Sequence, residues 1–196
     1  NSQRAGELMQ LSTINLQPST YKVWDCCAAS GGKSILVKDV SGNIDLTVSD
    51  IRESILYNLK KRFDEAGIKN YNSFLADLST VNCQLPATNF DLIIADVPCS
   101  GSGTWSRTPE QLYFFNNSAI GQYSQLQKKI ITNVVLKLKP GGHLLYITCS
   151  VFKRENEELV NFIREKFHLQ LIKQEVLKGY DKKADTMFAA LLQKPL

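Results

Sequence analysis

Several features that mark other protein classes are missing from this 196-residue sequence. No apolar run approaches the roughly 20 residues of a membrane-spanning helix, and no secretory signal is visible. Internal repeats and low-complexity stretches are also absent. The five cysteines are odd in number and include no C-x-x-C pair. A disulfide framework and a structural zinc site are therefore disfavoured, no metal is expected, and a reducing cytoplasm is the predicted location.

What is present fits one globular domain. Apolar residues make up 43% of the chain and charged residues 21%, which is ordinary for a folded enzyme. The net charge of +4 is compatible with a polyanionic partner but does not require one. The sequence begins at Asn1 rather than Met, so we expect further chain upstream. It does not set the oligomeric state, and a monomer is the working expectation.

Short β-branched runs alternate with helical patterns, which predicts an α/β domain with a mainly parallel sheet. We expect strands over residues 21–26, 43–49, 71–76, 90–95, 143–148, 169–173 and 187–192. We expect helices over residues 3–11, 31–39, 52–66, 118–138 and 154–166. Lys139 to Gly142 should act as breakers after the fourth of these helices. The polar link 174–186 is too short for a crossover helix, so the last strand should run antiparallel.

The first candidate motif is D-C-C-A-A-S-G-G-K-S, from Asp25 to Ser34. Small residues after a strand let a ligand approach the backbone, and the next helix offers free N–H groups. A phosphate-binding P-loop would need glycine at Cys27, and the dinucleotide pattern G-x-G-x-x-G is absent. A nucleoside cofactor without phosphate, such as S-adenosylmethionine, remains possible. A tight turn with no ligand fits a bare Gly-Gly pair equally well.

Two aspartates follow at predicted strand ends. Asp50 ends the second strand, where a carboxylate can accept hydrogen bonds from both ribose hydroxyls. Asp77 follows the third strand, where it could bind an adenine amino group. Either residue alone fits a solvated loop or a helix cap, but together after a Gly-rich turn they favour a cofactor site.

Two cysteines follow the fourth and fifth strands. Asp96-Val97-Pro98-Cys99 opens a Gly-rich loop, and Cys149 follows Thr148. Amino-methyltransferases commonly place an aromatic residue where Cys99 stands, so its presence disfavours amine methylation. Cys99 alone could be a small buried hydrophobe. Because the two strands should be neighbours, we expect both thiols to face one crevice. Cys26, Cys27 and Cys83 are interpreted as packing or loop residues.

These segments together resemble the RNA cytosine-5 methyltransferase family of the Sun or Fmu type, which is RsmB-like. Its members carry D-x-C-A-A-P-G-G-K-T, D-A-P-C-S-G-T-G, and T-C-S followed by E-N-E, which here is Glu155-Asn156-Glu157. The terminal D-T-M-F-A-A resembles the family's D-G-F-F-x-A strand. The resemblance runs from about Gln3 to the C-terminus. Ser30 replaces the usual Pro, Ser106 replaces a first Arg, and Thr186-Met187 replaces Gly-Phe, but no reacting group is lost.

The resemblance implies a Rossmann-like class I S-adenosylmethionine-dependent methyltransferase fold, with seven strands and an antiparallel last strand. It implies methylation of carbon 5 of cytosine in RNA, with ribosomal RNA as the leading candidate and an upstream RNA-binding region outside this chain. Cys149 would be the nucleophile, Cys99 would help release the product, Asp96 would hold the ring near N3, and Lys33 would orient Asp96 or lower a thiol pKa. The implied cofactor contacts are Cys27, Ala28, Ala29, Ser30, Gly31, Gly32, Lys33, Asp50, Asp77 and Asp96.

Several other residues, and the function itself, have more than one interpretation. Trp105 and Arg107 are candidates for base stacking and phosphate contact, though a surface role fits each equally. The basic run Lys60-Lys61-Arg62 is interpreted as the solvated face of its helix. A DNA cytosine-5 methyltransferase, in which the P-C cysteine attacks, and a non-catalytic RNA-binding assembly factor are the alternative functions.

Overall fold

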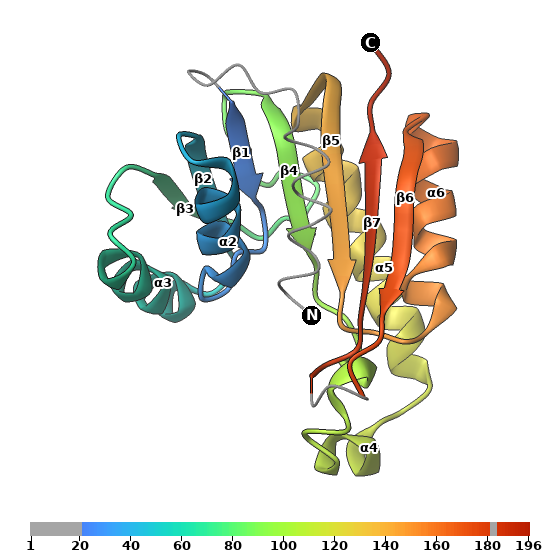
Figure 1. Ribbon diagram of the computed structural model, residues 1–196. Coiled ribbons are helices and arrows are strands. Elements are labelled where there is room, and N and C mark those ends of the chain that lie inside the picture. The colour runs from blue at the N-terminus through green and yellow to red at the C-terminus, as the bar shows by residue number, and fades with distance from the viewer. Residues whose placement is uncertain (1–20, 181–183) are drawn as a thin grey trace.

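The computed structural model describes residues 21–180 and 184–196 (Figure 1). Seven strands form one sheet in the order β3-β2-β1-β4-β5-β7-β6. The strands are β1 (Lys22–Asp25), β2 (Asp45–Asp50), β3 (Asn72–Leu75), β4 (Phe90–Asp96), β5 (Leu138–Thr148), β6 (Gln170–Leu177) and β7 (Met187–Gln193). Pairing is parallel from β3 to β5, and β7 runs antiparallel to both of its neighbours. The predicted sheet is therefore confirmed.

Helices cover both faces of the sheet (Figure 1). The helices are α2 (Gly32–Ser41), α3 (Glu53–Glu65), the short α4 (Glu110–Phe114), α5 (Ser118–Val134) and α6 (Glu157–Phe167). Buried side chains of α2 and α3 form one apolar cluster with the sheet, and those of α5 and α6 form the other. The helix predicted over residues 3–11 lies outside the described residues.

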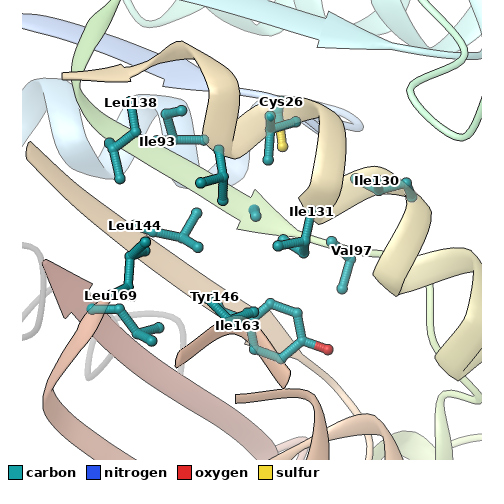
Figure 2. Close-up of a cluster of buried hydrophobic side chains, with 14 of the residues drawn as sticks. Cys26, Ile93, Val97, Ile130, Ile131, Leu138, Leu144, Tyr146, Ile163 and Leu169 are labelled. Carbon is teal, nitrogen blue, oxygen red and sulfur yellow. The ribbon is translucent and has the colours of Figure 1, made fainter. Parts of the chain in front are cut away.

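The residues of the central strand β4 alternate between the two apolar clusters. Leu92 and Ile94 join the cluster under α2 and α3, whereas Ile93 and Ala95 join the cluster under α5 and α6. Figure 2 shows the second cluster, which includes Ile93 of β4 and Ile131 of α5. Successive strand residues point to opposite faces, so a strand covered on both sides must be apolar throughout. Burying one such side chain contributes roughly 1.5–3 kcal/mol.

The structure corrects the breaker interpretation of Lys139 to Gly142. Helix α5 ends at Val134 and a 3-10 turn follows over Val135–Lys137. Strand β5 then begins at Leu138, and the pairing with β4 shifts register between the start of the strand and His143. Lys139 to Gly142 therefore form an irregularity inside a longer strand, which the positive φ of Gly141, 73°, accommodates.

Two further boundaries differ from the prediction. Strand β6 extends to Leu177, because polar residues 173–175 lie on an edge strand that pairs along its whole length with β7. Helix α6 begins at Glu157, after a 3-10 turn over Lys153–Glu155. Glu155, which the predicted helix over residues 154–166 would place in its first turn, is instead fully buried. Within the described residues, no helix is both long enough and apolar enough to cross a membrane.

Candidate active site

A cavity of about 360 Å³ opens at the carboxyl ends of the central strands. Parallel sheets bind ligands at this edge, and the volume is within the range of small-molecule sites. Seven predicted site residues line the cavity: Cys27, Ala29, Asp50, Asp77, Asp96, Cys99 and Cys149. Sequence reasoning missed the apolar walls, which are Ile51, Ala76, Leu78, Val97, Pro98, Leu126 and Ile130.

The turn between β1 and α2 forms one side of the cavity through an unusual backbone path. Ala29 has φ 46° and Gly31 has φ 82°, so two residues lie in the left-handed region. A Cβ on Gly31 would lie 2.6 Å from the ring of Phe63 and 3.1 Å from Leu59, both on α3. Glycine is therefore required at this position, because it permits both the backbone angle and the close packing of α3.

The other predicted residues of this turn support the cavity without lining it. Ala28 is buried and its N–H donates to the Ser49 carbonyl at 2.9 Å, whereas Gly32 is exposed at the start of α2. The carbonyl and hydroxyl oxygens of Ser30 accept hydrogen bonds from Arg62 Nη1 at 2.9 and 2.7 Å. Arg62 is exposed, as predicted for this helix face, and its side chain also holds the turn through Ser30.

Asp50 reaches the cavity with its carboxylate already bonded to protein groups. Oδ1 accepts hydrogen bonds from Arg52 N and Nε, both at 3.0 Å, and Oδ2 accepts from Ala29 N at 3.0 Å. Burial alone would raise the pKa of Asp50, but these hydrogen bonds outweigh it and the pKa is lowered. The Arg52 side chain is 57% exposed, so it can move aside for a ligand hydroxyl.

Asp77 forms a tight turn at the opposite wall. Its Oδ1 accepts hydrogen bonds from Ser79 Oγ at 2.6 Å and Ser79 N at 2.9 Å. These bonds lower the pKa of Asp77, so the carboxylate is charged near neutral pH. The turn fixes the side chain at the cavity wall and leaves Oδ2 as a further acceptor.

Asp25, the last residue of β1, is a buried acid beneath the site that sequence reasoning did not single out. Its Oδ2 accepts a hydrogen bond from Ser34 Oγ at 2.6 Å, while Oδ1 has no hydrogen-bond partner among the described residues. Burial raises the pKa of Asp25 to about 7, and the Ser34 bond only partly opposes this. Its place at the head of the first motif was the available signal.

Lys33 projects from α2 toward the end of β4. Its Nζ lies 2.5 Å from Asp96 Oδ2, and both side chains are partly buried. Burial alone would lower the pKa of Lys33, but the adjacent Asp96 carboxylate outweighs it and the pKa is raised. Lys33 therefore forms a close ion pair with Asp96 at the cavity wall, and its role in orienting that residue stays a prediction.

Cys99 and Cys149 meet in the same cavity. They follow neighbouring parallel strands, β4 and β5, and their Sγ atoms are 3.2 Å apart. All five cysteines of the chain are free thiols. Cys26 packs in the apolar cluster beneath α5 and α6 and also lines the cavity, whereas Cys83 is partly buried in a loop that packs against the same cluster.

The two thiols differ in acidity. The hydrogen bond from Cys99 lowers the pKa of Cys149 against the effect of burial, and Lys33 lowers it further, whereas Asp96 opposes this. The same thiol–thiol bond, together with burial, raises the pKa of Cys99 well above its usual range. Cys149 is therefore the more acidic thiol of the pair.

The loop after β4 docks directly against the loop after β5. Gly103 N donates to the Cys149 carbonyl at 2.8 Å, and the Gly103 carbonyl accepts from Thr186 N at 2.9 Å. A Cβ on Gly103 would collide with the Thr186 carbonyl, so only glycine permits this approach. The loop that carries Cys99 is thus held against both β5 and the start of β7.

Trp105 and Arg107 lie farther along this loop. The Trp105 ring packs against Phe115 and Phe152, with centroids 4.8 and 6.1 Å away. Arg107, 69% exposed, pairs with Asp185 at 2.8 Å. Both residues therefore have protein partners, and their predicted contacts with RNA stay predictions.

The side chains around the cavity can bind a ligand and supply a nucleophile. Three carboxylates, Asp50, Asp77 and Asp96, face a partly apolar cavity, which suits a nucleoside that carries hydroxyl groups and positive charge better than a phosphorylated one. An acidic thiol at the wall can act as a nucleophile. Across residues 21–180 and 184–196, no group of three or more His, Cys, Asp or Glu side chains could hold a metal ion.

The chain is similar in sequence to known ribosomal RNA methyltransferases. The family model described as 16S rRNA methyltransferase RsmB/F matches residues 12–193. Ribosomal RNA small subunit methyltransferase B of Shewanella oneidensis is 29% identical over 156 residues, which cover 80% of this chain and 36% of that protein. The chain thus spans about a third of the length of such relatives.

Solved structures agree on the fold. The crystal structure of PH0851 superposes with a TM-score of 0.83 and 26% identity, covering 96% of this chain and 46% of that one. NSun6 from Pyrococcus horikoshii, solved with SFG, gives a TM-score of 0.82 at 19% identity over 98% of this chain and 51% of that one. The fold is that of S-adenosylmethionine-dependent methyltransferases, and the matching family uses this cofactor.

Proposed function

We propose that this chain, which belongs to the 16S rRNA methyltransferase RsmB/F family, methylates carbon 5 of a cytosine in small-subunit ribosomal RNA through a covalent bond to Cys149. The observation that carries the proposal is the contact of two thiols, 3.2 Å apart, in a cavity that is also lined by Asp96, whose carboxylate pairs with Lys33. An enzyme that methylates an exocyclic amine needs no thiol at either position.

The residues of the cavity fit S-adenosylmethionine. Asp50 and Asp77 can accept hydrogen bonds from ribose hydroxyls and from an adenine amino group, and the apolar wall that includes Leu78 and Ile130 suits a flat ring. The acidic lining favours a positively charged ligand over a phosphate. When bound, S-adenosylmethionine supplies an electrophilic methyl group.

Cys149 activates the target base. Carbon 5 of cytosine is a poor nucleophile, but a thiolate that adds to carbon 6 gives carbon 5 enamine character. The hydrogen bond from Cys99 lowers the pKa of Cys149, which favours that thiolate. The cytosine must leave its base stack to reach the cavity.

Asp96 and Lys33 stabilise the base while it is attached to Cys149. Negative charge develops toward N3 as the thiolate adds, and a proton held on Asp96 or shared with it would neutralise that charge. Lys33, 2.5 Å from Asp96, keeps this carboxyl oriented toward the cavity. The ion pair therefore has a positioning and an electrostatic role.

Cys99 completes the reaction. Once the Cys149 sulfur is bonded to carbon 6, it no longer accepts the hydrogen bond that raises the pKa of Cys99. Cys99 can then release its proton to solvent, and its thiolate accepts the proton from carbon 5. Loss of that proton restores the double bond between carbons 5 and 6, breaks the bond to Cys149 and regenerates its thiolate.

The test is product analysis with a small-subunit ribosomal RNA transcript and methyl-labelled cofactor. The wild-type protein should yield 5-methylcytidine, and Cys149→Ala should yield none while it still binds the cofactor in calorimetry. Cys83→Ala, which removes a thiol outside the cavity, is the matched control and should retain activity. Label on another nucleoside, or 5-methylcytidine from Cys149→Ala, would refute the proposal.

A further inference from the structure

Glu155 is a fully buried carboxylate that joins two loops. Its Oε1 accepts a hydrogen bond from Ser100 N at 2.9 Å. Its Oε2 accepts one from Ser100 Oγ at 2.6 Å and a short one from Ser150 Oγ. One side chain therefore binds residues 50 positions apart in the sequence.

These two serines are the direct neighbours of the two cysteines. Ser100 follows Cys99 and Ser150 follows Cys149. Ser102 adds a second link, because its Oγ accepts from Val151 N at 2.9 Å and lies 3.3 Å from Ser150 Oγ. Both serines therefore bind the same side-chain carboxyl group, that of Glu155.

Strand β5 and the following turn hold Glu155 in place. Tyr146 OH donates to the Glu155 carbonyl at 2.6 Å. The adjacent Asn156 accepts from Thr148 Oγ1 at 2.6 Å and donates to the Ser150 carbonyl at 2.8 Å. The buried carboxylate is thus a fixed point from which both cysteine loops are held.

Burying a carboxylate is costly unless hydrogen bonds compensate it, and packing alone would be served by an apolar residue. Here all the compensating bonds to the carboxylate come from the two loops that carry Cys99 and Cys149. We propose that Glu155 is a positioning residue that holds these loops in register and thereby keeps the two thiols in contact. Only the catalytic meaning of that contact rests on the proposed function.

The contact has a measurable chemical consequence. The titratable groups that face the Cys149 thiol are Cys99 from the loop after β4, Asp96 at the end of β4 and Lys33 on α2. Among these, the Cys99 hydrogen bond lowers the pKa of Cys149 most. If loss of Glu155 lets the loops separate, that bond weakens and Cys149 becomes less acidic.

The test measures the pH dependence of Cys149 alkylation by iodoacetamide, read by mass spectrometry of the peptide that contains it. It uses the full chain and needs neither RNA nor cofactor. Glu155→Ala should raise the midpoint of the Cys149 profile by about one unit. Glu155→Gln preserves the volume and the acceptor for Ser100 N, so it should give a smaller rise. Glu158→Ala, an exposed neighbour on α6, is the matched control and should not change the midpoint.

The outcomes separate this inference from the proposed function. A raised midpoint in a variant that keeps its wild-type circular dichroism supports positioning by Glu155, whether or not the protein methylates RNA. If Glu155→Ala does not fold, the Gln variant decides. An unchanged midpoint in a folded Glu155 variant, or an equal rise in Glu158→Ala, would overturn the inference.

Discussion

Replacing Asp25 with Asn should remove a strong pH dependence from the stability of the fold. Asp25 is buried and its pKa is raised to about 7 from an ordinary 3.8, chiefly by burial. Below pH 4 the acid is protonated in both the folded and the unfolded chain, so it imposes no penalty. As the pH rises from 4 to 7, only the unfolded chain ionises, and folding becomes steadily less favourable. Above pH 7 the penalty stays constant.

The magnitude follows from the size of the shift. The rise of the Asp25 pKa from 3.8 to about 7, at about 1.4 kcal/mol per pH unit, gives a penalty of about 4 kcal/mol above pH 7. Asn has nearly the same shape and can still accept the hydrogen bond from Ser34 Oγ. Asp25→Asn should therefore gain stability relative to the wild type by about that amount between pH 4 and pH 7.

Urea unfolding, followed by the fluorescence of the buried Trp24, measures this difference at each pH. Subtracting wild type from variant cancels the titration of those shared groups that do not interact with Asp25. Asp39→Asn, at an exposed position of α2, is the control and should give a difference that does not change with pH. A difference for Asp25→Asn that stays flat from pH 4 to pH 8 would refute the reasoning.

Two smaller predictions concern the loops around the cavity. Gly103→Ala should lower the free energy of unfolding by about 2 kcal/mol or more, because the added Cβ would collide with backbone atoms. Gly32→Ala adds its Cβ in open space and should lower the free energy of unfolding by less than about 0.5 kcal/mol. Urea denaturation of the two variants measures both changes. Arg62→Ala should weaken S-adenosylmethionine binding about three- to fivefold, because an exposed pair of hydrogen bonds to Ser30 is lost. Calorimetry measures this effect, Lys61→Ala is the control, and equal affinities for both variants would contradict the role of Arg62.

The sequence was sufficient to predict the sheet and the pair of thiols. Apolar runs such as residues 90–95 reveal buried strands, and the order of strands and helices limits the topology to a few choices. Cys99 and Cys149 could be paired because neighbouring parallel strands end at the same edge of the sheet. The roles of the individual residues stay predictions.

What the sequence did not predict depends on contacts between distant segments. The pattern of Glu155 to Glu158 suits the start of a helix, but the burial of Glu155 follows from loops that arrive from residues 100 and 150. The pKa of Asp25 depends on how completely the sheet and α2 cover it. Arg62 looked solvated because the Ser30 carbonyl that it binds lies 32 residues away.

Covalent trapping of RNA tests the central claim most directly. Cys99→Ala, incubated with a small-subunit ribosomal RNA transcript and S-adenosylmethionine, should form a complex that survives denaturing electrophoresis, because Cys149 still attacks but release is blocked. The Cys99→Ala/Cys149→Ala double variant should form none. A complex that persists in the double variant, or that forms with Cys149→Ala alone, would contradict the assignment of Cys149 as the nucleophile.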